Sequence, residues 1–98
     1  MTTVKYLITE NNIELEIQGH AGFDEVGKDI VCAAISILSQ TFIGCMEEES
    51  EYCDYRIDPG YVWIQASGYK VVDCFKPILV GYQLLEDNYP AYIEVIEV

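Results

Sequence analysis

The hydrophobic residues of this chain change their spacing along the sequence, from every second residue to every third or fourth and back again. Ile13, Leu15 and Ile17 alternate strictly with polar residues, which is the pattern of a β-strand with one buried face. From Asp29 onward apolar residues recur at helical spacing, and the same change is repeated in the second half of the chain. The spacing therefore predicts the order ββαββαβ, an α+β fold with two helices packed on a mostly antiparallel sheet.

Turn-forming residues and proline set the boundaries between these elements. Asp58-Pro59-Gly60 is a turn, because proline presets one backbone angle and glycine supplies the other. Helical spacing runs from residue 71 to 88, but Pro77 fits a helix only in its first turn, so we place the second helix at 76–87. The other predicted elements are strands 4–9 and 13–18, a glycine loop 19–28, a helix from Asp29 to residue 45 or 46, and strands 52–57, 61–67 and 92–98.

The chain is short and acidic, which limits its size and its partners. Its 98 residues suffice for one domain, residues 1–98, with a modest core. The net charge of −12 repels nucleic acids and anionic membranes, so we expect neither as a partner, whereas a basic protein would be attracted. The longest apolar stretch, residues 30–38, falls short of the roughly 20 residues that a membrane span needs. Since no apolar signal-peptide core is found near residue 1, the expected location is cytoplasmic.

Four cysteines occur at irregular spacings and without a C-x-x-C pair, at Cys32, Cys45, Cys53 and Cys74. This spacing favours neither a disulfide framework nor a zinc site, because zinc ligands are usually closely paired and the chain has a single histidine. We therefore expect no metal and no cofactor. The ordinary interpretation of most of these cysteines is a small, buried apolar residue.

Cys32 differs from the other cysteines in its predicted position on the first helix. We expect the apolar face of this helix to include Ile30 and Ile37, whereas Cys32 shares a stripe with the polar residues Ser36 and Ser39. A purely structural cysteine would more often lie among the apolar residues. The predicted position therefore favours a functional thiol.

Asp29 is a favoured residue for the N-cap of this helix, which would make Cys32 the third helical residue. Backbone dipoles favour an anion there, and the thiolate is the reactive form of cysteine. His20 lies where the second strand meets the glycine loop, close enough in sequence to fold back on Cys32 and accept its proton. First-turn amides, including that of Cys32, are candidates for an oxyanion hole. An ordinary loop histidine and a buried helix cysteine remain the alternatives.

Two neighbouring segments form a longer pattern, Gly19-His20-Ala21 and then Gly27-Lys28-Asp29-Ile30-Val31-Cys32-Ala33-Ala34, with Ser36 close behind. This pattern resembles the signature of the ribosomal-processing cysteine protease family, Prp, which is Gly-His-Ala followed by Gly-x-Asp-Ile-Val-Cys-Ala-Ala and a nearby serine. The resemblance extends over the whole chain in length and element order. It also includes Tyr89-Pro90 before the last strand.

The resemblance implies a cytoplasmic cysteine endopeptidase that forms a homodimer and uses His20 and Cys32 as a catalytic dyad. Its substrate would be the twenty-seventh protein of the large ribosomal subunit, from which family members remove a short N-terminal extension. We expect Asp29 to act more as a helix cap than as a third catalytic residue that orients His20. Ser36 would add at most a supporting hydrogen bond, and an ordinary serine on the helix surface is the favoured interpretation.

The glycine-bounded loop 21–28 is a candidate lid over the substrate, through Gly22, Phe23 and Gly27. Other classes of function stay open on the residues alone. An acidic, non-catalytic module could bind or chaperone a basic ribosomal protein, which would explain the charge but would leave His20 and Cys32 without a role. A thiol redox protein is a second alternative, although the chain lacks C-x-x-C.

Overall fold

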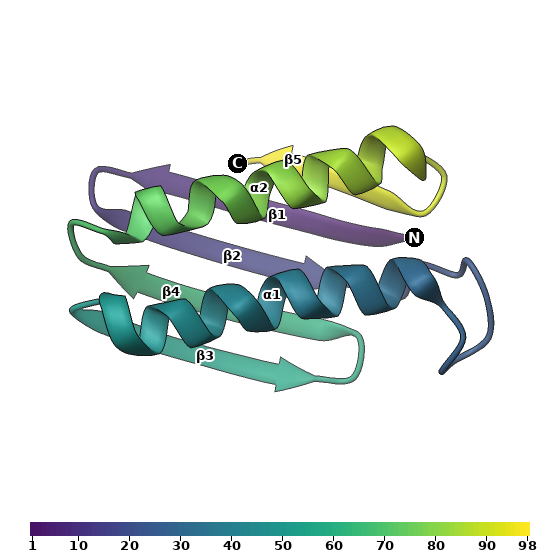
Figure 1. Cartoon of the computed structure of the whole chain (residues 1–98), viewed down its shortest axis with the longest axis horizontal. Helices are drawn as coiled ribbons and strands as arrows, with labels where there is room; N and C mark the ends of the chain where they lie inside the picture. Colours follow the sequence, from purple (N-terminus) through teal and green to yellow (C-terminus); the bar gives the residue numbers. More distant parts are fainter.

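The computed structural model describes all 98 residues and contains the predicted elements in the predicted order (Figure 1). The fold prediction of two helices on a mostly antiparallel sheet is therefore confirmed. The strands are β1 (Thr2–Thr9), β2 (Asn12–Gln18), β3 (Tyr52–Asp58), β4 (Tyr61–Ser67) and β5 (Ile93–Glu97), and the helices are α1 (Ile30–Glu49) and α2 (Val71–Asn88).

The five strands form one sheet in the order β3-β4-β2-β1-β5. Neighbouring strands are antiparallel except β1 and β5, which are parallel because α2 carries the chain across the sheet between β4 and β5. Both helices cover the same face, so the opposite face of the sheet has no covering layer (Figure 1). The start of α1, the end of β2 and the β3–β4 turn meet at one end of the molecule, where we look for the site.

The core lies between the sheet and the two helices. Ile13, Leu15 and Ile17 of β2 are all buried, as their alternation predicted. Leu15 is paired with Ile64 of β4, and on the helix side Phe75 packs against the strands. The period-two pattern thus decides which face of the sheet carries the helices.

The buried face of α1 differs from the predicted one. Ile30 and Ile37 were expected to face the core, but both are exposed, Ile37 to 63%. The helix is apolar on most of its circumference, so the spacing fits more than one face. Ser39 is accommodated in the core because its hydroxyl donates to the Ile35 carbonyl at 2.7 Å and pairs with the Tyr82 hydroxyl at 2.7 Å. The residues that face the core are Val31, Ile35, Ser39, Phe42, Ile43 and Met46.

The prediction that α1 ends at residue 45 or 46 was wrong, because the helix continues to Glu49. Carboxylates in the last turn oppose the helix dipole, but here two of them have partners. Tyr55 donates from its hydroxyl to Glu47 at 3.0 Å, and Lys70 forms an ion pair with Glu49 at 3.0 Å.

The predicted start of α2 was also wrong, since the helix begins at Val71 and contains Pro77 beyond its first turn. Proline removes the hydrogen bond to the carbonyl of Asp73, four residues earlier. Both Pro77 and Asp73 are exposed, so water can satisfy that carbonyl.

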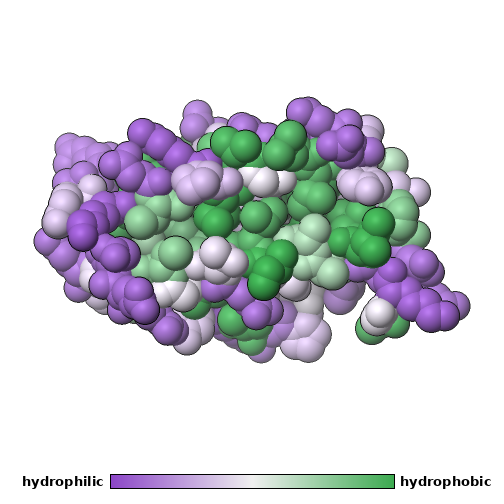
Figure 2. Space-filling model, viewed as in Figure 1, coloured by the Kyte–Doolittle hydropathy of each residue, from purple (hydrophilic) through white to green (hydrophobic).

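By length and composition α1 meets the criteria for a membrane span, with a mean hydropathy of 1.6. This differs from the prediction that no apolar stretch of the sequence is long enough to span a membrane. The same criteria also admit a core helix of a globular protein, and α1 buries one side on the sheet. Its apolar residues are not all covered. Figure 2 shows hydrophobic side chains across the helix side of the molecule, and Ile37, Val80 and Leu84 are each more than half exposed. We call these three residues the apolar helix face.

Candidate active site

Two hollows flank the start of α1 and share His20, Cys32 and Ser36 in their linings. The first, of about 260 Å³, lies between α1 and the β3–β4 turn, and apolar side chains such as Ile35 and Val62 line part of it. The second, of about 350 Å³, lies between α1 and the loop 21–28. The predicted dyad is therefore placed between two cavities that open on either side of it.

Cys32 is the third residue of α1, as the sequence predicted, because Asp29 is the N-cap. Its sulfur accepts a hydrogen bond from the backbone N–H of Ala21 at 3.3 Å. The thiol therefore lies at a helix N-terminus and beside a loop amide, in a hollow that it shares with His20.

The other three cysteines lack this environment. All four thiols are free and partly buried, but Cys32 alone lines a hollow. Burial raises the pKa of the Cys74 thiol, and burial together with Glu47 raises that of Cys53, so both are held in the less reactive thiol form. No three metal-ligating side chains lie close enough together to hold an ion.

His20 follows β2 and packs its imidazole against the turn between β3 and β4. Gly19 donates from its N–H to the Gly60 carbonyl at 2.8 Å, which joins the histidine segment to this turn. A Cβ on Gly60 would lie 2.8 Å from Nε2 of His20, and Gly60 also has a positive φ of 69°. Only glycine satisfies both conditions, so the turn acts as a close-fitting support for the ring.

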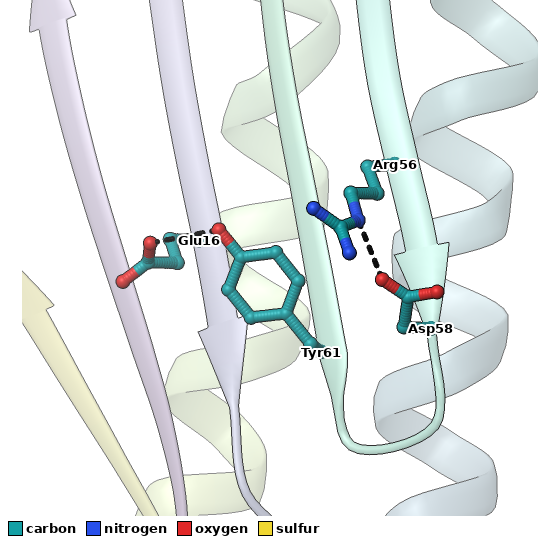
Figure 3. A network of polar contacts seen from close by, with 4 residues as sticks. All are labelled: Glu16, Arg56, Asp58 and Tyr61. Carbon is teal, nitrogen blue, oxygen red and sulfur yellow. Dashed lines mark hydrogen bonds and ion pairs between the residues drawn. The ribbon is translucent and has the colours of Figure 1, made fainter.

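Polar contacts on the open face of the sheet brace this turn (Figure 3). Tyr61, the residue after Gly60, donates from its hydroxyl to Glu16 of β2 at 3.0 Å. On β3, Arg56 donates to Asp58, the first residue of the turn. The contact of Tyr61 ties the residue after the turn to β2, whereas the contact between Arg56 and Asp58 stays within β3.

Asp29 is buried and uses both carboxylate oxygens as hydrogen-bond acceptors. One accepts the N–H of Cys32 at 2.9 Å, and the other accepts the N–H groups of Phe23 at 2.9 Å and Asp24 at 3.3 Å. Burial alone would raise the pKa of Asp29, but these amides, together with the Cys32 thiol, outweigh it and hold the pKa below its usual value. Neither oxygen is bonded to His20, which agrees with the expected role of a cap.

Two of the proposed oxyanion donors in the first turn are already engaged. The Cys32 amide is bonded to the Asp29 side chain, and the Ala33 amide donates to the Asp29 carbonyl at 3.0 Å. The Cys32 amide, one of the candidates for the oxyanion hole, is thus bonded to the cap in this structure. Ala21, in the loop, provides the amide that is directed at the sulfur.

The remaining predicted site residues differ in which of the two hollows they line. Ser36 is exposed and lines both hollows, and its hydroxyl makes no hydrogen bond to the protein. Gly22 and Gly27 line the second hollow. Phe23 does not line it, because its ring packs against Tyr89 and Tyr92.

Two contributors to the site were missed by sequence reasoning. Gly60 was identified as part of a turn, but nothing in the local pattern indicates that this turn touches the histidine. Ala21 acts through its backbone, which carries no residue-specific signal. The only available sign concerned Ala21, which directly follows His20 in the segment Gly19-His20-Ala21.

The lowered pKa of Asp29 predicts a pH-dependent contribution to stability. Because the folded pKa lies below the unfolded value of roughly 3.9, the contribution is complete above about pH 5 and is lost as the pH falls through the folded pKa. Asp29→Asn should lower the free energy of unfolding by about 1–2 kcal/mol at neutral pH, measured by urea unfolding. The difference from the unmodified chain should shrink below about pH 3.

Asp54→Asn is the matched control, because Asp54 is an exposed carboxylate without a hydrogen bond. A gap between Asp29→Asn and the unmodified chain that stays constant from neutral to acid pH would contradict the assigned role of the charge.

Comparison with known proteins identifies the family of the chain. The family model for cysteine protease Prp matches residues 1–94. The essential ribosomal processing protease Prp from S. aureus, solved with a covalently linked product peptide, superposes with a TM-score of 0.89 at 25% identity over 100% of both chains. The same S. aureus protease with a substrate peptide gives 0.83 at 24% identity, again over 100% of both chains.

SMU.848 from Streptococcus mutans shares the fold, with a TM-score of 0.74 and 24% identity over 100% of this chain and 94% of that one. No curated protein matches the chain by sequence. The family match covers nearly the whole sequence and includes both segments of the signature. The chain belongs to the Prp family of cysteine proteases.

Proposed function

We propose that this protein is a ribosomal-processing endopeptidase in which Cys32 is the nucleophile and His20 is the general base. Its proposed substrate is the twenty-seventh protein of the large ribosomal subunit, from which it removes an N-terminal extension. The main support is the placement of Cys32, whose sulfur lies at a helix N-terminus and receives a loop amide in a cleft shared with His20.

In the proposed reaction, His20 takes the thiol proton of Cys32 and the sulfur attacks the scissile carbonyl carbon. The N–H of Ala21, which donates to the sulfur in this structure, then donates its hydrogen bond to the developing oxyanion instead. His20 then donates its proton to the leaving amine, which gives a thioester on Cys32. Water, activated by His20, hydrolyses the thioester and restores the thiol. His20 and Cys32 line the same hollows but are not hydrogen-bonded in this structure, so the imidazole rotates from its place against the Gly60 turn to reach the thiol.

The two hollows suggest how a peptide would cross the dyad. One side of the scissile bond would enter the first hollow, where Ile35 and Val62 favour an apolar side chain. The other side would lie under the loop, along Gly22 and Gly27. The exposed hydroxyl of Ser36 lies in both linings and is available to the peptide backbone. The S. aureus protease was solved with substrate and product peptides, which supports a peptide ligand here.

Substitution of the dyad should separate this proposal from a non-catalytic binding module. With a peptide spanning the proposed cleavage site, Cys32→Ala should abolish cleavage, and His20→Ala should reduce kcat/KM by about 10²–10⁴-fold. Cys53→Ala is the matched control and should retain activity, because Cys53 lines neither hollow. Cleavage products are measured by mass spectrometry.

Cleavage that survives Cys32→Ala would refute the nucleophile. Tight binding without cleavage by the unmodified chain would favour the acidic chaperone that the sequence left open.

Gly60→Ala should impair catalysis by displacing the histidine. The new Cβ would lie 2.8 Å from Nε2 of His20, at a backbone angle that alanine disfavours. We expect kcat/KM to fall at least about tenfold. Gly68→Ala is the matched control, because Gly68 also has a positive φ, of 144°, but lies away from both hollows. We expect the Gly68 variant to lose stability but to keep its activity. A Gly60 variant that also keeps full activity would disprove the support role.

We further propose that the protein is a cytoplasmic homodimer. Four free thiols suit a reducing compartment. The apolar helix face gives a second copy a surface to cover, and it surrounds the point where Gly81 of α2 approaches Leu38 of α1.

Charging this face should therefore dissociate the dimer. Ile37→Glu and Leu84→Glu should convert a dimer into monomers in sedimentation equilibrium, because each buries a charge at the proposed interface. Leu7→Glu, on the open face of the sheet, is the control and should remain dimeric. A dimer that survives both substitutions on the helices would place the interface elsewhere.

A further inference from the structure

Phe23, in the loop before α1, is held by two tyrosines from the other end of the chain. Its ring lies 5.5 Å from that of Tyr89 and 5.1 Å from that of Tyr92, at interplanar angles of 86° and 76°. These are edge-to-face arrangements, in which the positive edge of one ring meets the negative face of another. We call Tyr89 and Tyr92 the tyrosine cradle.

The cradle is fixed to the body of the protein through its backbone. Tyr89 donates from its N–H to Leu85 at the end of α2, and Tyr92 donates to the Tyr89 carbonyl. The carbonyl of Tyr92 in turn accepts the N–H of Thr2 in β1 at 2.9 Å. The cradle is thus a rigid part of the connection between α2 and β5, and substitution of its rings leaves these hydrogen bonds in place.

The cradle and Asp29 hold the same part of the loop from two sides. The ring of Phe23 packs against the tyrosine cradle, and its N–H donates a hydrogen bond to the Asp29 carboxylate. Two residues earlier, Ala21 directs its own N–H at the sulfur of Cys32. By contrast, Val26 at the tip of the loop is 98% exposed. The structure therefore divides the loop into an anchored first half, which reaches the sulfur, and a free tip.

We propose that Tyr89 and Tyr92 are positioning residues for the cleavage reaction. By holding the ring of Phe23, they keep the Ala21 amide beside the sulfur of Cys32 and keep the second hollow formed. They touch neither hollow themselves. The kinetic part of this inference rests on the proposed function, whereas its structural part, the anchoring of the loop, does not.

Hydrogen exchange tests the structural part without a substrate. In Tyr89→Leu and Tyr92→Leu, the amides of Ala21, Phe23 and Asp24 should exchange about tenfold faster than in the unmodified chain, because these amides depend on the anchored loop. Tyr92→Phe keeps the ring and should restore slow exchange. Tyr52→Leu, an exposed tyrosine of β3 outside both hollows, should leave loop exchange unchanged.

Steady-state cleavage tests the kinetic part. The leucine variants should lower kcat/KM about tenfold, with a higher KM because the second hollow is no longer preformed. Phe23→Leu removes both ring contacts and should have at least the same effect, and combining it with Tyr92→Leu should add little, since the Phe23–Tyr92 contact is then already lost. Phe23 lies on a partly exposed loop, so this variant reports on the contact without risk to the core.

Unchanged loop exchange in the leucine variants would overturn the inference, as would a Tyr92→Phe variant that is impaired as much as Tyr92→Leu. Fully additive losses for Phe23→Leu and Tyr92→Leu would also contradict it. If the unmodified chain cleaved no peptide, but the loop amides exchanged faster in the leucine variants as expected, the proposed function would fail and the anchoring of the loop would stand.

Discussion

Asp29 accepts hydrogen bonds from the first turn of α1 and from the loop before it, and the geometry of the site follows from this arrangement. Its carboxylate joins the amides of Cys32, Phe23 and Asp24 at one buried point. Burial of a charge is costly unless its lone pairs are satisfied, and here the amides more than compensate, as the lowered pKa shows. The position of the sulfur relative to the Ala21 amide depends on this junction, because it fixes the helix and the loop together.

The sequence contained enough to predict the fold and the start of the site. Strict alternation in β2 identified the strand and its buried face, and the turn at Asp58-Pro59-Gly60 separated β3 from β4 correctly. Asp29 was recognisable as a cap because capping is a local interaction between residues three apart. The family signature covers the same segment, so local chemistry and resemblance led to the same residues.

What the sequence could not predict depends on contacts between distant segments. The helix face was misplaced because Ile37 and Ile35 are equally apolar, and only the sheet decides which is buried. For the same reason the prediction for Cys32 started from a wrongly assigned helix face. What distinguishes Cys32 in the structure is that it lines a hollow and that its sulfur accepts a hydrogen bond from a loop amide. The support of His20 by Gly60 joins two hairpins that are far apart in the chain. Periodicity carries no information about such encounters.

The most direct test of the account is to identify the residue that becomes acylated during turnover. The protein is mixed with its substrate peptide, quenched in acid and mapped by tandem mass spectrometry, so that a thioester adduct is assigned to one of the four cysteines. The account predicts an adduct on Cys32, which has His20 as its proposed base and the Ala21 amide beside its sulfur. It predicts no adduct on the three thiols outside the hollows. Turnover with an adduct on Cys45, Cys53 or Cys74, and none on Cys32, would contradict it.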